Sequence, residues 1–206
     1  MSRLYDIHPE NPQPRRIAEV ADTLRRGGLV AYPSDCSYSL GWHIGDQRAS
    51  KEIERIRQTD KHHNFTLMCR DLSELANYAK VDNWVYRLLK SHTPGAYTFI
   101  LKATREVPRR LMNPKRKTIG LRVPDHPVPL AILEELGEPM MSSSLILPDE
   151  DMPLTDANEI LHRLGKDLDA VIDSGNCGFE PTTVVDLTGD FPVVLRKGKG
   201  DVTDFE

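Results

Sequence analysis

Short apolar runs alternate along the chain with segments whose apolar residues follow helical spacing. Ile17, Val20, Ala21 and Leu24 recur at i, i+3, i+4 and i+7, which predicts an amphipathic helix over 14–26. The same spacing, or a capping pattern before it, predicts further helices around 49–56, after Asp71, and over 84–89, 128–136 and 156–164.

The apolar runs between these helices have the length and composition of buried strands. They cover 29–32, 65–69, 97–101, 118–123, 140–144, 168–172, 182–187 and 193–196. The last two runs are separated only by the turn 189–192, and so short a turn joins only antiparallel neighbours. The pattern therefore predicts an α/β fold with a mixed parallel and antiparallel sheet and flanking helices.

The length of 206 residues suits one large domain, and no stretch reads as a linker. We expect a single domain over 14–200, with 1–13 and 201–206 as terminal extensions. Cys36, Cys69 and Cys177 have no paired spacing, which favours reduced thiols and a cytoplasmic location. No stretch approaches the roughly 20 apolar residues of a membrane span, so no membrane partner is expected.

The net charge of −4 hides an uneven distribution along the chain. The segment 102–122 contains eight Lys or Arg residues and one acid, Glu106, so it carries +7 and leaves −11 for the remainder. Its most basic members are Arg109, Arg110, Lys115, Arg116 and Lys117. Such a run is either a solvated face or a surface that contacts phosphate or nucleic acid.

Hydroxyl side chains and arginines recur at the ends of the predicted strands, where open α/β sheets form binding sites. They are Ser34, Ser142, Ser143, Ser144, Thr182, Thr183, Arg122 and Arg196. A single Ser or Thr at the end of a strand is most often a turn or cap residue. The occurrence of all these hydroxyls together with two arginines favours a phosphate-binding site. His62 and His63 are adjacent, so they cannot face one metal from a helix, and no metal site is predicted.

Five ordered motifs resemble those of the YrdC/YciO family. They are YPSDCSYSLG at 32–41, PGAYTFIL at 94–101, GLRVP at 120–124, TTVVD at 182–186 and VLRKG at 194–198. The resemblance implies a twisted mixed sheet with a concave, basic face. In catalytic members it also implies condensation of L-threonine, bicarbonate and ATP, with Mg²⁺, to threonylcarbamoyl-AMP, a precursor in tRNA modification.

Two family motifs that bind ATP are altered in this chain. The lysine and arginine of the KxR motif correspond to Arg57 and Thr59, and the asparagine of the SxN motif to Ile146. Loss of one hydrogen bond to a charged group costs about 2 kcal/mol, or about 30-fold in affinity. These departures resemble the YciO branch.

The resemblance also assigns site residues. It implies nucleotide or phosphate binding by Arg57, Arg122, Ser142, Ser144 and Arg196, and threonine binding by Ser34 and Thr183. It implies ATP as a substrate and no tightly bound cofactor. Two hypotheses follow: a nucleotide-binding enzyme of altered activity that forms or hydrolyses threonylcarbamoyl-AMP, and a non-catalytic protein that binds tRNA or double-stranded RNA through the basic segment.

Overall fold

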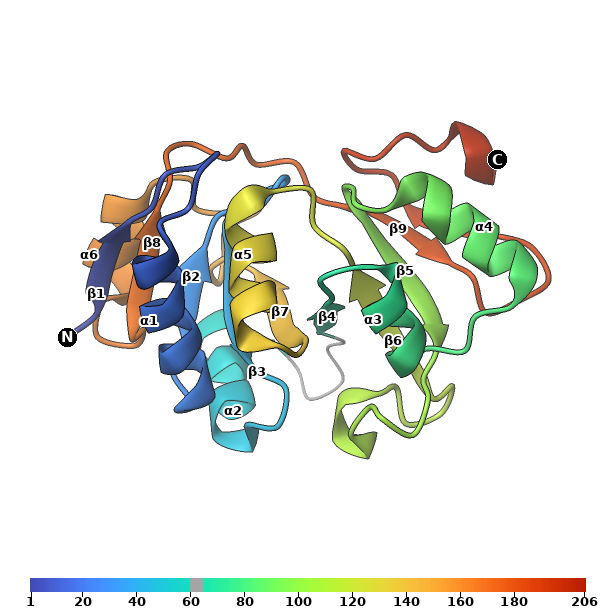
Figure 1. Ribbon diagram of the computed structural model, residues 1–206, viewed down its shortest axis with the longest axis horizontal. Helices are drawn as coiled ribbons and strands as arrows, with labels where there is room; N and C mark the ends of the chain where they lie inside the picture. Colours follow the sequence, from blue (N-terminus) through green and yellow to red (C-terminus); the bar gives the residue numbers. More distant parts are fainter. Residues whose placement is uncertain (60–64) are drawn as a thin grey trace.

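A single ten-stranded sheet runs through the molecule, and helices lie on both sides of it (Figure 1). The computed structural model describes residues 1–59 and 65–206. The strands are β1 (Arg3–Asp6), β2 (Val30–Tyr32), β3 (Ser39–His43), β4 (Thr66–Met68), β5 (Tyr97–Lys102), β6 (Thr118–Arg122), β7 (Met140–Ser144), β8 (Ala170–Asp173), β9 (Thr183–Asp186) and β10 (Val193–Arg196). The α-helices are α1 (Pro14–Arg25), α2 (Gln47–Arg57), α3 (Leu72–Tyr78), α4 (Asn83–His92), α5 (Pro127–Leu136) and α6 (Ala157–Leu164), and the 3-10 helices are η1 (Arg109–Leu111) and η2 (Thr203–Phe205).

The sheet mixes parallel and antiparallel pairs, in the order β1-β8-β2-β3-β7-β4-β6-β5-β9-β10. The predicted antiparallel hairpin of β9 and β10 is confirmed, and so are the mixed sheet and its flanking helices. The helix after Asp71 is also confirmed, because the Asp71 side chain accepts from the backbone N–H of Glu74 at 2.8 Å. This contact satisfies an amide that has no partner within the helix.

Two strands were not predicted from the sequence. In β3, Ser39 and Gly41 read as turn residues, yet this strand lies inside the sheet between β2 and β7. In β1, only Tyr5 is buried, and the strand is held by parallel pairing with β8 along one side. Part of the expected extension 1–13 is therefore an edge strand of the sheet.

The two halves of the sheet are covered differently. Across β1, β8, β2, β3 and β7, α1 and α5 pack on one face around Val30 and Tyr32, and α2 and α6 pack on the other. Across β4, β6, β5 and β9, α3 and α4 pack around Leu67, Phe99 and Leu121. The strand register places these three residues on the same face of the sheet as the one that α2 covers in the other half.

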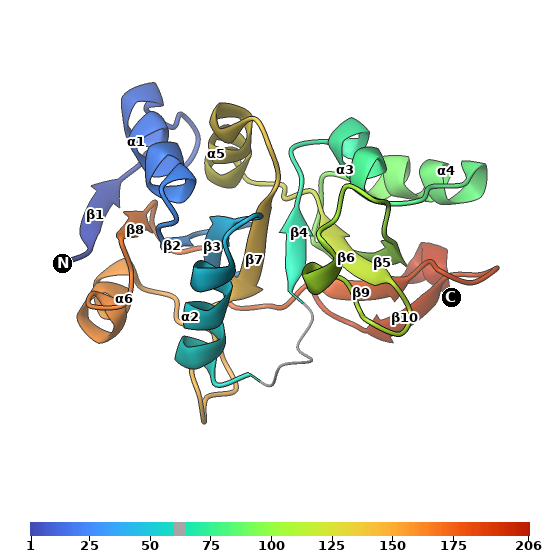
Figure 2. The same ribbon diagram turned by 90° about the horizontal axis from the view of Figure 1, so that it is seen from below.

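The twist of the sheet brings these helices together. Neighbouring strands rotate by about 20° to 25°, so ten strands make roughly a half-turn. Figure 2 accordingly shows α1, α5, α3 and α4 along the same side, although they pack on opposite faces of the sheet. No helix covers the second face of β4, β6, β5 and β9 within the described residues. This open face positions the candidate site.

None of the helices in the described residues is long and apolar enough to cross a membrane.

Candidate nucleotide-binding site

The open face of the sheet is polar because the strands that form it alternate. In β6, Ile119 and Leu121 are buried in the core, while Thr118, Gly120 and Arg122 line a cavity on the opposite face. Successive side chains of a strand point to opposite faces, so one apolar set makes the core and the other set is available for a ligand. Strands β4, β5 and β7 contribute in the same way.

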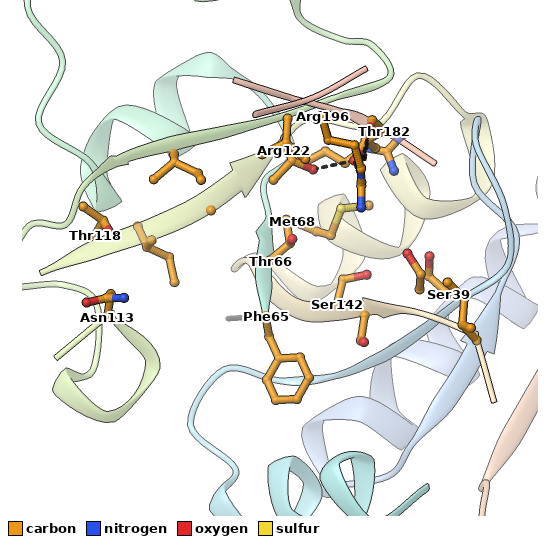
Figure 3. Close-up of a pocket in the computed structure, with 18 of the residues that line it drawn as sticks. Ser39, Phe65, Thr66, Met68, Asn113, Thr118, Arg122, Ser142, Thr182 and Arg196 are labelled. Carbon is orange, nitrogen blue, oxygen red and sulfur yellow. Dashed lines mark hydrogen bonds between the residues drawn. The ribbon is translucent and has the colours of Figure 1, made fainter. Parts of the chain in front are cut away.

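These side chains line one cavity of about 270 Å³, shown in Figure 3. Its lining includes eight hydroxyl side chains: Ser39, Thr66, Thr98, Thr118, Ser142, Ser143, Ser144 and Thr182. It also includes four arginines: Arg57, Arg116, Arg122 and Arg196. Among the described residues that line it, there is no Asp or Glu. A lining of hydroxyls and guanidinium groups without carboxylates is suited to an anion.

Two of the arginines, Arg57 and Arg196, donate hydrogen bonds to neutral groups of the described chain. Arg57, the last residue of α2, donates from Nη1 to Ser143 Oγ at 2.5 Å and from Nε to the carbonyl of Ile146 at 3.3 Å. Arg196, the last residue of β10, donates from Nε and Nη2 to the carbonyl of Thr182 at 3.1 and 2.9 Å. Burial lowers the pKa of both guanidinium groups. A negatively charged ligand beside either guanidinium group favours its charged form.

The other two arginines form ion pairs. Arg122 donates from Nη2 to Asp35 Oδ1, and the two side chains are only 6% and 10% exposed. Arg116 donates from Nη2 to Asp186 Oδ2 at 2.7 Å and to Thr188 Oγ1 at 2.9 Å. Hydrogen bonds from Thr188 and Arg116 hold the pKa of Asp186 below its usual range, against the desolvation that would raise it.

Hydrogen bonds between side chains fix several hydroxyls of the lining. Ser142 Oγ lies 2.5 Å from the Tyr32 hydroxyl, and Thr98 Oγ1 lies 2.9 Å from Thr182 Oγ1. Burial raises the pKa of Tyr32 to about 12, so its hydroxyl keeps its proton at neutral pH. Each hydroxyl is both donor and acceptor, and these contacts leave capacity for a ligand.

The five residues assigned to nucleotide or phosphate binding lie around this one cavity. They are Arg57, Arg122, Ser142, Ser144 and Arg196. Arg122, Ser144 and Arg196 are the last residues of β6, β7 and β10, but the cavity also extends along the face of the sheet to mid-strand residues such as Thr98 and Gly120. The reason is the missing helix layer on that face.

The two residues assigned to threonine lie outside the lining and have structural partners. Ser34 Oγ donates to the carbonyl of Ser37 at 2.8 Å and accepts from the N–H groups of Cys36 and Ser37. Thr183 Oγ1 donates to the carbonyl of Gly200 at 2.6 Å and accepts from Gly198 N–H at 3.0 Å. Contact of either side chain with threonine stays a prediction.

The basic residues predicted to contact RNA are exposed beside the cavity. Arg116 and the nearby Asn113 belong to its lining, and Arg110 donates from Nη2 to the carbonyl of Ile44 at 3.2 Å. Arg109, Lys115 and Lys117 form no ion pair within 1–59 and 65–206. Their role in RNA binding stays a prediction.

Sequence reasoning missed the mid-strand part of the lining. Thr66, Thr98 and Thr118 alternate with core residues, but a polar position in a strand usually indicates a solvated face. Ile146, which replaces the family's asparagine, does line the cavity. His62 and His63, for which no metal site is predicted, fall outside the described residues.

Comparisons with known proteins identify close and distant relatives. The chain is 55% identical to YciO of Escherichia coli strain K12 over 205 residues, with 100% of both chains covered. The crystal structure of Escherichia coli YciO matches the fold with a TM-score of 0.96 over 100% of both chains.

Two more distant relatives have names that refer to a reaction or a ligand. The threonylcarbamoyl-AMP synthase of Bacillus subtilis strain 168 is 29% identical over 195 residues, and the match covers 94% of this chain but 55% of the synthase. The crystal structure of Pyrococcus abyssi Sua5 complexed with L-threonine has a TM-score of 0.87 at 26% identity, covering 96% of this chain and 58% of Sua5. This chain thus spans little more than half of each of these proteins.

A family model agrees with these matches. The Sua5/YciO/YrdC model, whose description reads "Telomere recombination", matches residues 22–198. This range contains the cavity and nine of the ten strands. The chain therefore belongs to the Sua5/YciO/YrdC family.

Proposed function

We propose that the cavity binds ATP and L-threonine and, with bicarbonate, joins them in threonylcarbamoyl-AMP. The observation that carries this proposal is the lining itself, in which four arginines and eight hydroxyls surround one cavity without a carboxylate among the described residues. Similarity to a threonylcarbamoyl-AMP synthase and to a Sua5 that binds L-threonine supports the same substrates.

The reaction demands orientation and charge neutralisation rather than covalent catalysis. L-threonine and bicarbonate first condense to N-carboxythreonine with loss of one water molecule. A carbamate oxygen of N-carboxythreonine then attacks the α-phosphorus of ATP, the bond between this phosphorus and the oxygen that bridges it to the β-phosphorus breaks, and pyrophosphate leaves. Arg57 and Arg196 are placed to neutralise phosphate charge, and the hydroxyls of Ser142 and Ser144 to donate to phosphate oxygens. Mg²⁺ prefers carboxylate and phosphate oxygens, so with this lining it enters bound to ATP.

The altered motifs reduce the expected affinity for ATP. Ile146 offers no hydrogen bond where the family's asparagine does, and one lost contact to a charged group weakens binding about 30-fold. Arg57 keeps the positive charge of the motif lysine but spreads it over a planar group. We therefore expect slow synthesis and measurable binding.

The direct test combines calorimetry with an assay for pyrophosphate. ATP and L-threonine should bind the wild-type chain, and pyrophosphate release should require both L-threonine and bicarbonate. Undetectable ATP binding together with release no higher than a protein-free blank would refute the proposal.

A matched pair of variants tests the site. Arg57→Ala should weaken ATP binding by about 30-fold, because it removes a half-buried guanidinium from the lining. Arg48→Ala removes an exposed cation from the same helix, outside the cavity, and should leave ATP affinity unchanged. Equal effects of both substitutions would show that net charge, not the cavity, determines binding.

We further propose that the exposed basic residues beside the cavity bind the phosphate backbone of tRNA or double-stranded RNA. The favouring observation is that Arg109, Lys115 and Lys117 have no acidic partner in the described chain, while Arg116 joins this surface to the cavity. Such binding should weaken with salt, log K falling by about 0.7 to 0.9 per phosphate contact for each unit of log salt.

Removing these cations should reduce the salt dependence. In the test variant Arg109, Arg110, Lys115, Arg116 and Lys117 are changed to alanine. In a control of equal charge the exposed residues Arg15, Arg26, Arg48, Lys51 and Lys166 are changed instead. RNA affinity that is equal in the two variants would contradict a localised RNA surface.

A further inference from the structure

The last strand of the sheet, β10, has an exposed apolar outer edge. It ends the strand order, so β9 pairs with one side of it and no strand of the described chain pairs with the other (Figure 2). Eight large hydrophobic side chains are exposed in the described residues, and three of them fall within five consecutive positions. They are Phe191, Val193 and Leu195, with 78%, 53% and 55% of their surface exposed. Such a cluster beside an unpaired strand edge indicates a contact with another chain.

The pairing of β9 and β10 places this apolar cluster beside the open face of the sheet. Arg196 is opposite Val184, whose side chain lines the cavity. The register shift before Arg196 is a β-bulge, in which Leu195 and Arg196 share the position opposite Val184. Val194 packs against the core, so the preceding Val193 points to the opposite, open face. The exposed apolar side chains therefore form a strip that borders the cavity.

Strand β10 lacks the charges that usually protect the edge of a sheet. The other edge strand, β1, begins with Arg3 and ends with Asp6. The segment 191–195 contains no charged residue, and natural edges commonly use charges to avoid pairing. Its protections are Pro192 and the bulge at Leu195, which keep the free edge short. A short free edge makes a small interface, which suits reversible association.

The charges that flank the segment 191–195 are self-complementary. Asp190 precedes it, and Arg196 and Lys197 follow it. Lys197 contacts Glu206 of its own chain at 2.5 Å, but both side chains are more than half exposed, and such ion pairs contribute little. When two copies align antiparallel around Val193, the acid of each copy lies beside the basic residues of the other. A parallel alignment would place like charges together, so the pattern fits an antiparallel second copy.

We propose that β10 pairs with β10 of a second copy of this chain, antiparallel around a two-fold axis at Val193. The backbone groups of the free edge then gain partners, and the apolar strips of the two copies cover each other. Because the axis is perpendicular to the sheet, it does not exchange the two faces. The two ten-stranded sheets become continuous, and both cavities lie on the same face. This interface goes beyond the proposed function, which needs only one copy.

Sedimentation equilibrium of the full chain measures this association. The average mass of the wild type should rise with concentration from that of one chain toward that of two. Val193→Lys places two ammonium groups opposite each other at the axis, and it should raise the dissociation constant of the dimer about tenfold. The matched control is Leu4→Lys, which adds the same charge at an exposed apolar position of the other edge strand and should leave the dissociation constant unchanged.

A charge reversal tests the antiparallel alignment. Asp190→Lys puts a cation beside the basic residues of the other copy, so it should weaken the dimer. Adding Lys197→Asp to this variant provides an acid for the new lysine, and the double variant should recover most of the lost affinity. All these positions are exposed or outside the cavity lining, so the variants should keep the circular dichroism spectrum and the thermal midpoint of the wild type.

Three results would overturn the inference. A wild type that stays monomeric up to its solubility limit would refute the second copy and leave the edge to a different protein. Equal dissociation constants for Val193→Lys and Leu4→Lys would place any dimer interface elsewhere. A double variant as weak as Asp190→Lys alone would refute the antiparallel alignment. ATP binding by the same preparations tests the proposed function separately.

Discussion

Replacement of Gly198 by alanine should destabilise the segment that closes the cavity behind Arg196. Gly198 packs directly on the chain that leads into β9. A Cβ atom built on Gly198 would lie 2.3 Å from the carbonyl oxygen of Pro181 and 2.5 Å from that of Thr182, whereas real Cβ atoms essentially never approach closer than 3.0 Å. Because both neighbours are backbone atoms, one of the two segments must move by about 1 Å to reach an ordinary van der Waals distance.

The size of the effect follows from these contacts. Overpacking typically costs about 1–3 kcal/mol. Movement of Gly198 also breaks its N–H hydrogen bond to Thr183 Oγ1, which contributes about 1 kcal/mol. The free energy of unfolding should fall by about 2–4 kcal/mol, and the thermal midpoint of a chain of this size by about 4–16 °C. ATP should also bind more weakly, because the displaced Thr182 carbonyl anchors Arg196.

Urea denaturation followed by circular dichroism measures the stability. Gly189→Ala is the control, since the nearest atom to its added Cβ would be the carbonyl oxygen of Phe191 at 4.0 Å, and its stability should stay within about 0.5 kcal/mol of wild type. A Gly198→Ala chain as stable as the Gly189→Ala chain would refute the packing argument.

Three further predictions concern stability. Asp71→Ala should lower the free energy of unfolding by about 1 kcal/mol in urea titrations, because the Glu74 N–H loses its cap; an equal loss in Asp71→Asn would contradict this reason. Phe99→Ala should lower it by about 3–5 kcal/mol, since this fully buried ring fills the core; a loss below about 1 kcal/mol would show that the core collapses around it. Burial lowers the pKa of His126, so the unfolded chain binds more protons and stability should fall as pH drops through the unfolded value of 6.5. His126→Asn, which caps α5 without titrating, should reduce the stability difference between pH 7.5 and 5.5, and an unchanged difference would rule out His126 as its source.

The sequence predicted most of the fold because apolar spacing decides which residues can form a core. All six α-helices and eight of the ten strands in the described residues were expected. The strand β3 was not, since Ser39 and Gly41 suit turns, and tertiary pairing on both sides overrides that local preference. The strand β1 is too short for alternation to be visible.

The site was predictable in its chemistry but less so in its geometry. Arg122 and Arg196 were expected both from their places at strand ends and from the family motifs, and both line the cavity. Which polar strand positions face a ligand depends on which face lacks helices, and no local pattern contains that information. The sequence also could not show that the Ser34 hydroxyl forms its hydrogen bonds with the backbone of its own turn.

The strand order also has a consequence for synthesis of the protein on the ribosome. β7 joins β3 to β4, yet it begins only at residue 140, and β8, which separates β1 from β2, begins at residue 170. Until these late strands emerge, a nascent chain exposes unpaired edges on both halves of the sheet, a state prone to misassociation. We expect truncated chains that end before β7 to remain unfolded and to require chaperones, and folding to be completed only after β8 and the strands that follow it have emerged.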